Sequence, residues 1–190
     1  MADDAVQKDG IEEALEADGV FTGSDTVLAY GYARKSVWAE GPHLYRKDGY
    51  YYLIHAEMGT EQNHCVVVAR SKTVTGPYEY CLANPILTHR HLGKNYPVTC
   101  VGHADLVEDS AGNWYLVALG CRPQEGYTLM GRETFLAKVT WEDGWPVVNP
   151  GIGHLECENE TDVEESGQAI ADCAFTGIAI HGKRKLRRPV

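Results

Sequence analysis

The stretch HLYRKDGYYYLIH, residues 43–55, decides the fold class of this chain. Two runs typical of β-strands are joined there by Asp48-Gly49, and an Asp-Gly pair between such runs is the strongest short signal for a β-hairpin. Similar patterns predict hairpins at 104–119 and 135–148, and the run CVVVARS at 65–71 predicts a buried strand. The chain is therefore predicted to be all-β.

Composition agrees with this prediction but does not choose an architecture. The 190 residues include 20 Gly and 11 Tyr, which favours short strands and turns over long helices, and 44% of them are hydrophobic, enough for the core of one domain. Hairpins at similar spacing occur in β-propellers, β-sandwiches and meanders, so the spacing leaves these three alternatives open.

Charge and hydropathy narrow the expected partners and location. The formal net charge is −10, from 17 Lys and Arg against 27 Asp and Glu, which opposes binding to nucleic acids. The single basic cluster lies at 183–188. No run approaches the roughly 18 apolar residues of a membrane span, and the acidic beginning does not resemble a secretory signal. We therefore expect no nucleic-acid or membrane partner and a cytoplasmic location.

Metal and redox sites are not indicated by the cysteines and histidines. The six cysteines contain no CxxC pair, which favours free thiols. His89 and His91 would share one face of a strand, but no third ligand is spaced to join them, and we expect a polar loop there.

Three polar residues stand where predicted strands begin. Glu40 precedes Gly41-Pro42, a turn-forming pair, so its carboxylate is either a solvated loop group or a general acid that faces a cavity. His103 is either a hydrogen-bonded core histidine or a catalytic group. Arg132 has the planar donors that orient hydroxyls, although exposed arginines are common without such a role.

Eight short motifs occur in the order found in glycoside hydrolase family 43, and the chain resembles the β-xylosidase and α-L-arabinofuranosidase members of that family over residues 40–151. The motifs are EGPHLY (40–45), YYYL (50–53), AEMGT (56–60), ARS (69–71), GPYE (76–79), NPILT (84–88), GHAD (102–105) and GRETF (131–135).

This resemblance implies a five-bladed β-propeller with its substrate pocket on the central axis and hydrolysis with inversion of configuration. It implies that Glu40 is the general acid and that His103, Arg132 and Thr60 bind the sugar. It implies no required cofactor, although some members hold an ion on the axis near the residue that matches His103. The expected partner is a small xylo- or arabino-oligosaccharide.

The chain also departs from the family pattern. The general base and the aspartate that tunes the acid lie in motifs far upstream of the EGPHLY pattern, and neither has a match here, so the base is unassigned. Met58 stands where relatives usually have glycine. We expect an unassigned acidic leader at 1–39, about three of five blades at 40–151, and an unassigned, poorly ordered tail, first acidic and then basic, at 152–190.

These departures leave several hypotheses open. The first is an incomplete, weakly active or inactive fragment of a glycosidase. The second is a non-catalytic carbohydrate-binding pseudoenzyme, and the third is an acidic interaction protein with a basic tail. The open strand edges of an unclosed propeller also lead us to expect association into homo-oligomers.

Overall fold

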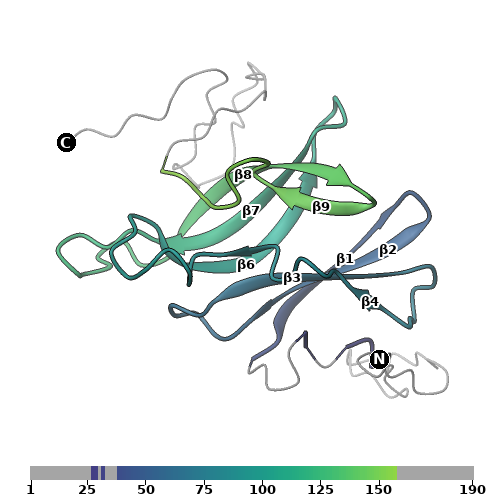
Figure 1. Cartoon of the computed structure of the whole chain (residues 1–190), viewed down its shortest axis with the longest axis horizontal. Coiled ribbons are helices and arrows are strands. Elements are labelled where there is room, and N and C mark those ends of the chain that lie inside the picture. The colour runs from purple at the N-terminus through teal and green to yellow at the C-terminus, as the bar shows by residue number, and fades with distance from the viewer. Residues whose placement is uncertain (1–26, 30, 33–37, 158–190) are drawn as a thin grey trace, which may run out of the picture.

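The structure is a computed structural model that describes residues 27–29, 31–32 and 38–157 (Figure 1). Most of the predicted leader and nearly all of the predicted tail, including the basic cluster at 183–188, lie outside these ranges. Every regular element within them is a β-strand, so the all-β prediction is confirmed. No helix in this part of the chain is long and apolar enough to cross a membrane.

The strands form two antiparallel sheets that lie one above the other in Figure 1. The first sheet has the order β1-β2-β3-β4, and β5 pairs with β3 beyond this path; its strands are β1 (Glu40–Lys47), β2 (Tyr50–Glu57), β3 (Cys65–Ser71), β4 (Glu79–Tyr80) and β5 (Leu87–Thr88). The second sheet has the order β6-β7-β8-β9; its strands are β6 (Thr99–Glu108), β7 (Trp114–Cys121), β8 (Glu133–Glu142) and β9 (Trp145–Val148).

The three predicted hairpins are confirmed as β1–β2, β6–β7 and β8–β9, and the predicted strand at 65–71 is β3. The turn between β1 and β2 has φ values of 48° at Asp48 and 80° at Gly49, and the turn between β8 and β9 repeats this pattern with 51° at Asp143 and 73° at Gly144. Two-residue hairpin turns need such positive φ angles, which explains why Asp-Gly marks both turns.

The three hairpins belong to two sheets, which is fewer than the three blades that we expected. We expected about three blades, but the described residues form two sheets. The third hairpin starts no new sheet because β8 pairs with β7 from Trp114↔Val139 to Gly120↔Glu133 and thereby extends the second sheet. A local turn signal cannot report which neighbour a strand pairs with.

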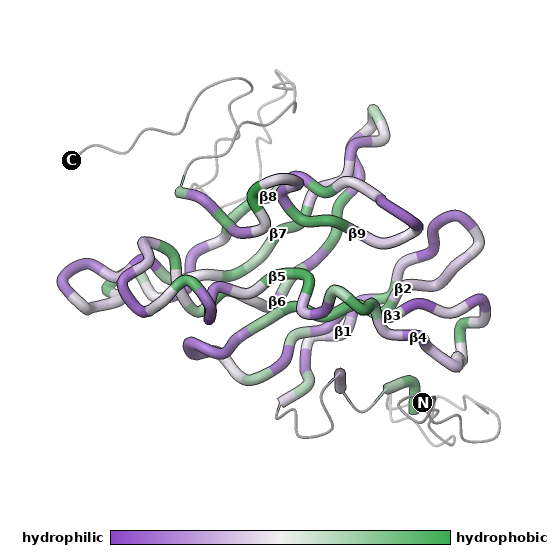
Figure 2. Tube along the Cα trace, in the orientation of Figure 1, coloured by the Kyte–Doolittle hydropathy of each residue, from purple (hydrophilic) through white to green (hydrophobic). Residues whose placement is uncertain are grey.

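The core lies between the two sheets. Ile54, Val66 and Val68 from the first sheet are buried there with Leu106 and Leu116 from the second. In Figure 2 the hydrophobic stretches follow the strands, whereas hydrophilic residues gather at the hairpin tips.

The other face of the first sheet is covered as well. Leu53, Ala69 and Tyr78 are buried there, and Leu28 and Ala29 pack against them. Burial on both faces explains why β3 is a continuous apolar run rather than an alternating one.

A second contact between the sheets, which we call the outer joint, is made by Tyr52, Arg70, Gly144 and Trp145. The Arg70 guanidinium lies 4.1 Å from the ring centroid of Trp145, and its Nη1 donates a hydrogen bond of 2.8 Å to the Gly144 carbonyl. The Tyr52 hydroxyl donates to the same carbonyl at 2.7 Å. A Cβ atom on Gly144 would lie 2.6 Å from Nη1 of Arg70, so glycine is needed for this close approach.

Candidate active site

The four residues predicted to act on a sugar lie where strands begin or end. Glu40 is the first residue of β1, and Arg132 directly precedes β8. His103 lies in the first half of β6, and Thr60 follows the end of β2.

Glu40 and His103 are brought together although they lie on different sheets. The distance from Glu40 Oε1 to His103 Nδ1 is 3.7 Å, and their side chains are 44% and 35% exposed. A Cβ atom on Gly41 would lie only 2.5 Å from Nε2 of His103, and Gly41 has a φ of 57°. The glycine after the acid is therefore required for the imidazole to lie against this strand.

Among the described residues His103 is not a hydrogen-bonded core histidine, and its role as a catalytic group stays a prediction. It is half-buried, with a φ of 51°, and its Nδ1 is shielded from solvent without a hydrogen-bond partner in the described part of the chain. This nitrogen faces the Glu40 carboxylate at ion-pair distance rather than a core acceptor.

His64 is a site residue that the sequence analysis missed. Its side chain is fully buried, and its Nδ1–H donates to the Cys100 carbonyl at 3.2 Å. A Cβ atom on Gly102 would lie 2.4 Å from the His64 ring, so this glycine makes room for the imidazole. The available signal was its position, because His64 stands directly before a strand as Arg132 does.

Burial and nearby charges favour the neutral form of His64. Burial is the main cause that lowers the pKa of His64, and the positive charges of His103 and Arg132 act in the same direction. The Cys100 carbonyl and the Glu40 carboxylate oppose this shift. Since Nδ1 carries the proton, Nε2 is a lone-pair acceptor, and within the described ranges it has no hydrogen-bond partner.

Glu40, His64 and His103 therefore form one cluster whose ligand atoms all lie within 4.8 Å of one another. Arg132 is near enough for its charge to act on His64, whereas Thr60 is exposed on the loop between β2 and β3. The structure thus associates three of the four predicted residues and adds His64, and it leaves the role of Thr60 a prediction.

The strands that carry this cluster are tied together by Tyr45. Its hydroxyl accepts a hydrogen bond of 2.9 Å from the Leu106 backbone N–H and donates to the Asp105 carboxylate. Burial is the main cause that raises the pKa of Tyr45. His43 Nδ1 lies 3.7 Å from the same carboxylate. Asp105 is therefore engaged in holding β1 against β6.

His89 and His91 differ in burial and in their hydrogen bonds. His89 is buried; its Nδ1–H donates to the Val98 carbonyl at 2.7 Å, and its Nε2 accepts from the Leu155 backbone N–H at 2.8 Å. His91 is exposed. Both residues lie in a loop, as expected, but His89 is buried in it and joins the segment after β9 to the loop before β6.

The described cysteines are free thiols, as expected. Cys65, Cys81 and Cys121 are buried, and burial raises the pKa of Cys65 to about 11. A neutral buried thiol is a packing group rather than a nucleophile.

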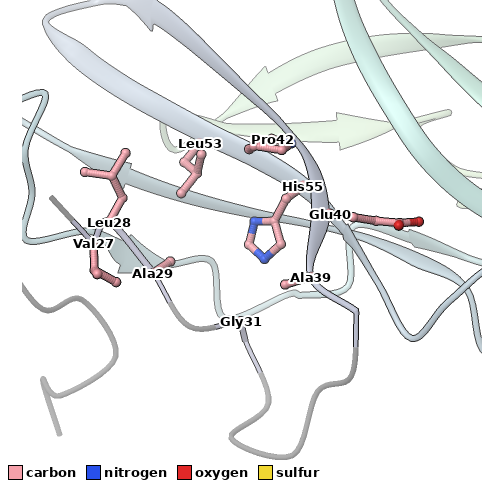
Figure 3. A pocket seen from close by; sticks show the side chains of 9 residues that line it. All are labelled: Val27, Leu28, Ala29, Gly31, Ala39, Glu40, Pro42, Leu53 and His55. Carbon is pink, nitrogen blue, oxygen red and sulfur yellow. The ribbon is translucent and has the colours of Figure 1, made fainter. Parts of the chain in front are cut away.

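A cavity of about 280 Å³ lies beside β1 and β2, and Glu40 is one of the residues that line it. In Figure 3 the imidazole of His55 lies among the side chains that line it, whereas the Glu40 carboxylate points away from them. His55 Nε2 lies 2.9 Å from Glu57 Oε1, and both side chains are buried. The cavity therefore adjoins the cluster through Glu40, whose carboxylate points away from the other lining side chains.

A half-exposed carboxylate, two imidazoles and a nearby guanidinium, held at the junction of two packed antiparallel sheets, define a polar site suited to a hydroxyl-rich ligand and to proton transfer. The family model of glycosyl hydrolases family 43 matches residues 7–146, and the chain belongs to this family. The match begins well before Glu40, so the family relationship extends into the segment that the motifs left unassigned.

Individual relatives agree with this family. The chain is 59% identical over 143 residues to a xylosidase/arabinosidase from Butyrivibrio fibrisolvens, which covers 75% of this chain and 28% of the relative. It is 50% identical over 111 residues to a non-reducing end α-L-arabinofuranosidase from Bacteroides ovatus, which covers 57% of this chain and 21% of the relative. The chain thus spans less than a third of the length of these relatives.

Solved structures show the same architecture. A family 43 protein from Bacillus licheniformis superposes with a TM-score of 0.64 at 44% identity, covering 70% of this chain and 26% of that one. A xylan β-1,4-xylosidase from Bacillus halodurans superposes with a TM-score of 0.65 at 39% identity, covering 79% and 30%. These neighbours are five-bladed β-propellers, so the two sheets correspond to part of such a propeller.

Proposed function

We propose that this chain carries the general-acid side of a glycoside hydrolase that acts on xylo- or arabino-oligosaccharides. The observation that carries the proposal is the Glu40 carboxylate, half-exposed and 3.7 Å from His103 beside the buried His64. Relatives named as xylosidase/arabinosidase and α-L-arabinofuranosidase support the substrate class.

Each group has a role in this reaction. Glu40, when protonated, donates its proton to the glycosidic oxygen as the bond to the leaving group breaks. Arg132 is exposed, and its guanidinium is available to donate hydrogen bonds to sugar hydroxyls. His103 and Thr60 are proposed as further sugar contacts.

The general base remains unassigned. An inverting enzyme needs a second carboxylate about 6.5–9.5 Å from the acid to activate water on the opposite face of the sugar. Asp105 lies two residues after His103, but Tyr45 and His43 engage its carboxylate. We therefore propose that this chain alone binds sugar with little or no turnover.

The cluster also fits an ion. His64 Nε2 and His103 Nδ1 are shielded nitrogens without hydrogen bonds among the described residues, and they lie with the Glu40 carboxylate within 4.8 Å. Two imidazoles and a carboxylate would hold a divalent ion, which would supply a fixed positive charge on the axis. A carboxylate bound to an ion cannot carry the proton of a general acid, so we propose that Glu40 acts with the ion absent or held by the imidazoles alone.

Titration calorimetry with xylobiose, followed by product analysis over hours, tests the proposal. We expect saturable binding by the chain and little xylose release, with the same affinity after treatment with a chelator. Lack of binding by the folded chain would contradict the proposal, and rapid hydrolysis would contradict the predicted need for a base from outside the chain.

A non-catalytic carbohydrate-binding protein is the second candidate, because no residue is assigned as the base. The two candidates separate when residues 7–146 replace the matching segment of the Butyrivibrio fibrisolvens relative. Cleavage of a nitrophenyl xyloside or arabinofuranoside by this chimera supports the hydrolase, whereas sugar binding without cleavage supports the binding protein.

A further inference from the structure

Trp38 is a large, exposed aromatic side chain just before the entrance of β1. It lies two residues before Glu40, and it is 68% exposed. Tryptophan is highly buried on average in folded proteins, and exposed apolar surface beside a polar site often marks a place where a ligand binds.

The indole is held in place by the neighbouring strand. Glu40 pairs with Ala56 across β1 and β2, which places Trp38 opposite the turn at Met58 and Gly59. A Cβ atom on Gly59 would lie 2.8 Å from Cε3 and 3.2 Å from Cζ3 of Trp38. The six-membered ring therefore rests on Gly59, at a point where a side chain would displace it.

The backbone at this point also adopts unusual angles. Trp38 has a φ of 55° and Met58 a φ of 69°, both in the left-handed region that costs energy for residues other than glycine. Such strain persists where the surrounding structure maintains it, and it gathers at functional sites. The local structure thus packs one side of the Trp38 indole against Gly59 and leaves the rest of its surface exposed to solvent.

We propose that the exposed surface of Trp38 is the stacking platform for the leaving-group sugar. The inference rests on the proposed function. His64, His103 and Arg132 come from the region of β3, β6 and β8, whereas Trp38 and Gly59 precede β1 and follow β2. Glu40 lies two residues after Trp38 in the chain and within 4.8 Å of the ligand atoms of His64 and His103, and a general acid must face the oxygen that bridges two sugars. One ring then lies toward the imidazoles and Arg132, and the next ring lies on Trp38.

The chemistry of the ligand suits this assignment. One face of a xylose ring carries C–H bonds, and an aromatic ring with a negative face attracts them while the hydroxyls remain in water. The platform would therefore select an oligosaccharide with a second sugar ring over a glycoside with a small alkyl leaving group.

Titration calorimetry with xylose and xylobiose on the whole chain tests this inference, using Trp38→Ala, Trp38→Phe and the wild type. Leu82→Ala is the matched control, because this apolar side chain is 99% exposed and lies between β4 and β5. Circular dichroism establishes that each variant is folded.

We expect xylobiose to bind the wild type more tightly than xylose does. Trp38→Ala should weaken xylobiose binding about tenfold and leave xylose binding unchanged within twofold. Trp38→Phe should keep most of the xylobiose affinity because it keeps a ring, and Leu82→Ala should bind both sugars as the wild type does.

Two results would overturn the inference while the proposed function stands: an unchanged xylobiose affinity in Trp38→Ala, or an equal loss of affinity for both sugars. If neither sugar binds the folded wild type, the proposed function fails, and the inference fails with it.

Discussion

The two sheets meet at the outer joint and at the Glu40 cluster, and the polar groups behave differently at these two places. At the outer joint the Arg70 guanidinium stacks on Trp145 and its Nη1 donates to the carbonyls of Asp143 and Gly144, while its Nε makes no hydrogen bond within the described residues and lies 3.8 Å from the Glu79 carboxylate. At the cluster, His64 Nε2 and His103 Nδ1 are shielded from water and, as far as the structure describes the chain, accept or donate no hydrogen bond.

We infer that the outer joint contributes mainly to stability, whereas the cluster contributes mainly to function. A buried polar atom left without a partner costs about 1–3 kcal/mol. At the outer joint the hydrogen bonds and ring contacts of Arg70 offset this cost for its Nε, whereas the two imidazole nitrogens of the cluster have fewer such contacts. Unused hydrogen-bonding capacity next to a carboxylate is what a site needs before its ligand arrives. We infer that the contacts of the outer joint hold the two sheets together. This allows His64 Nε2 and His103 Nδ1 to remain without hydrogen-bond partners among the described residues.

The largest expected effect is on catalysis at the cluster. In the chimera with the Butyrivibrio fibrisolvens relative, Glu40→Gln should lower kcat by roughly 100-fold or more on xylobiose, because the amide has no acidic proton to transfer to the leaving oxygen. Glu108→Gln, an exposed residue at the end of β6, is the control and should change kcat less than twofold. Undiminished cleavage in Glu40→Gln would remove Glu40 from the acid role.

The next effect is on stability at the outer joint. Arg70→Ala should lower the free energy of unfolding by about 3 kcal/mol, because it removes hydrogen bonds to two carbonyls and two contacts with aromatic rings. Urea unfolding measures this change. Arg46→Ala should cost less than about 1 kcal/mol, since Arg46 is exposed and lies 5.8 Å from the Tyr51 ring centroid.

Xylobiose affinity below the unfolding transition should be the same in Arg70→Ala and in the wild type. A large loss of affinity in the folded variant would show that the outer joint and the cluster are not separable, which is the opposite of what we infer.

A pair of glycine variants compares the cluster with the hydrophobic core between the sheets, to which Phe135 and Val98 belong. Gly102→Ala places a methyl group 2.4 Å from the His64 ring, so it should displace the imidazole and weaken xylobiose binding about tenfold. Gly120→Ala places a methyl group 3.1 Å from Phe135 and Val98, away from any imidazole. It should lower Tm and leave sugar affinity unchanged; equal affinities in the two variants would argue against a role for His64 in the site.

The smallest expected effect is a dependence of stability on pH that involves His89. Burial is the main cause that lowers the pKa of His89 from 6.5, and the hydrogen bond to the Val98 carbonyl opposes it while His154 adds to it. The unfolded chain then binds more protons than the folded chain, so stability is fully present above about pH 6.5 and decreases as the pH falls toward the folded pKa. His64 contributes with the same sign because its pKa is lowered too.

His89→Gln should reduce this acid-dependent loss, because the amide replaces both hydrogen bonds of the imidazole without a titrating group. His91→Gln, which alters an exposed neighbour, should leave the loss unchanged. Urea unfolding between pH 5 and 8 measures both slopes, and identical slopes in the two variants would show that His89 does not contribute.

Much of the fold was predictable because its signals are local. Asp48-Gly49 and Asp143-Gly144 sit in turns that need positive φ, and the apolar run at 65–71 became a strand buried on both faces. The number of sheets was not predictable in this way. It depends on the pairing of β8 with β7, which no turn residue encodes.

The site was predictable in part. Glu40, His103 and Arg132 stand near the beginnings of strands, and the resemblance to the family singled them out. His64 was missed because its neighbours are distant in the chain: its acceptor is the carbonyl of Cys100, 36 residues away, and its room is made by Gly102. The burial of His89 in its loop was not predicted for the same reason, since its Nε2 accepts a hydrogen bond from the N–H of Leu155, 66 residues away.

By itself, the sequence determined which segments become strands, where they turn, and that an acid stands at the entrance of β1. These properties follow from backbone preferences and side-chain patterns within about ten residues. Only the tertiary structure decided that three hairpins make two sheets and that two imidazoles meet the Glu40 carboxylate. Those outcomes depend on the free energy of long-range packing, in which a glycine on one sheet makes room for a histidine of the other.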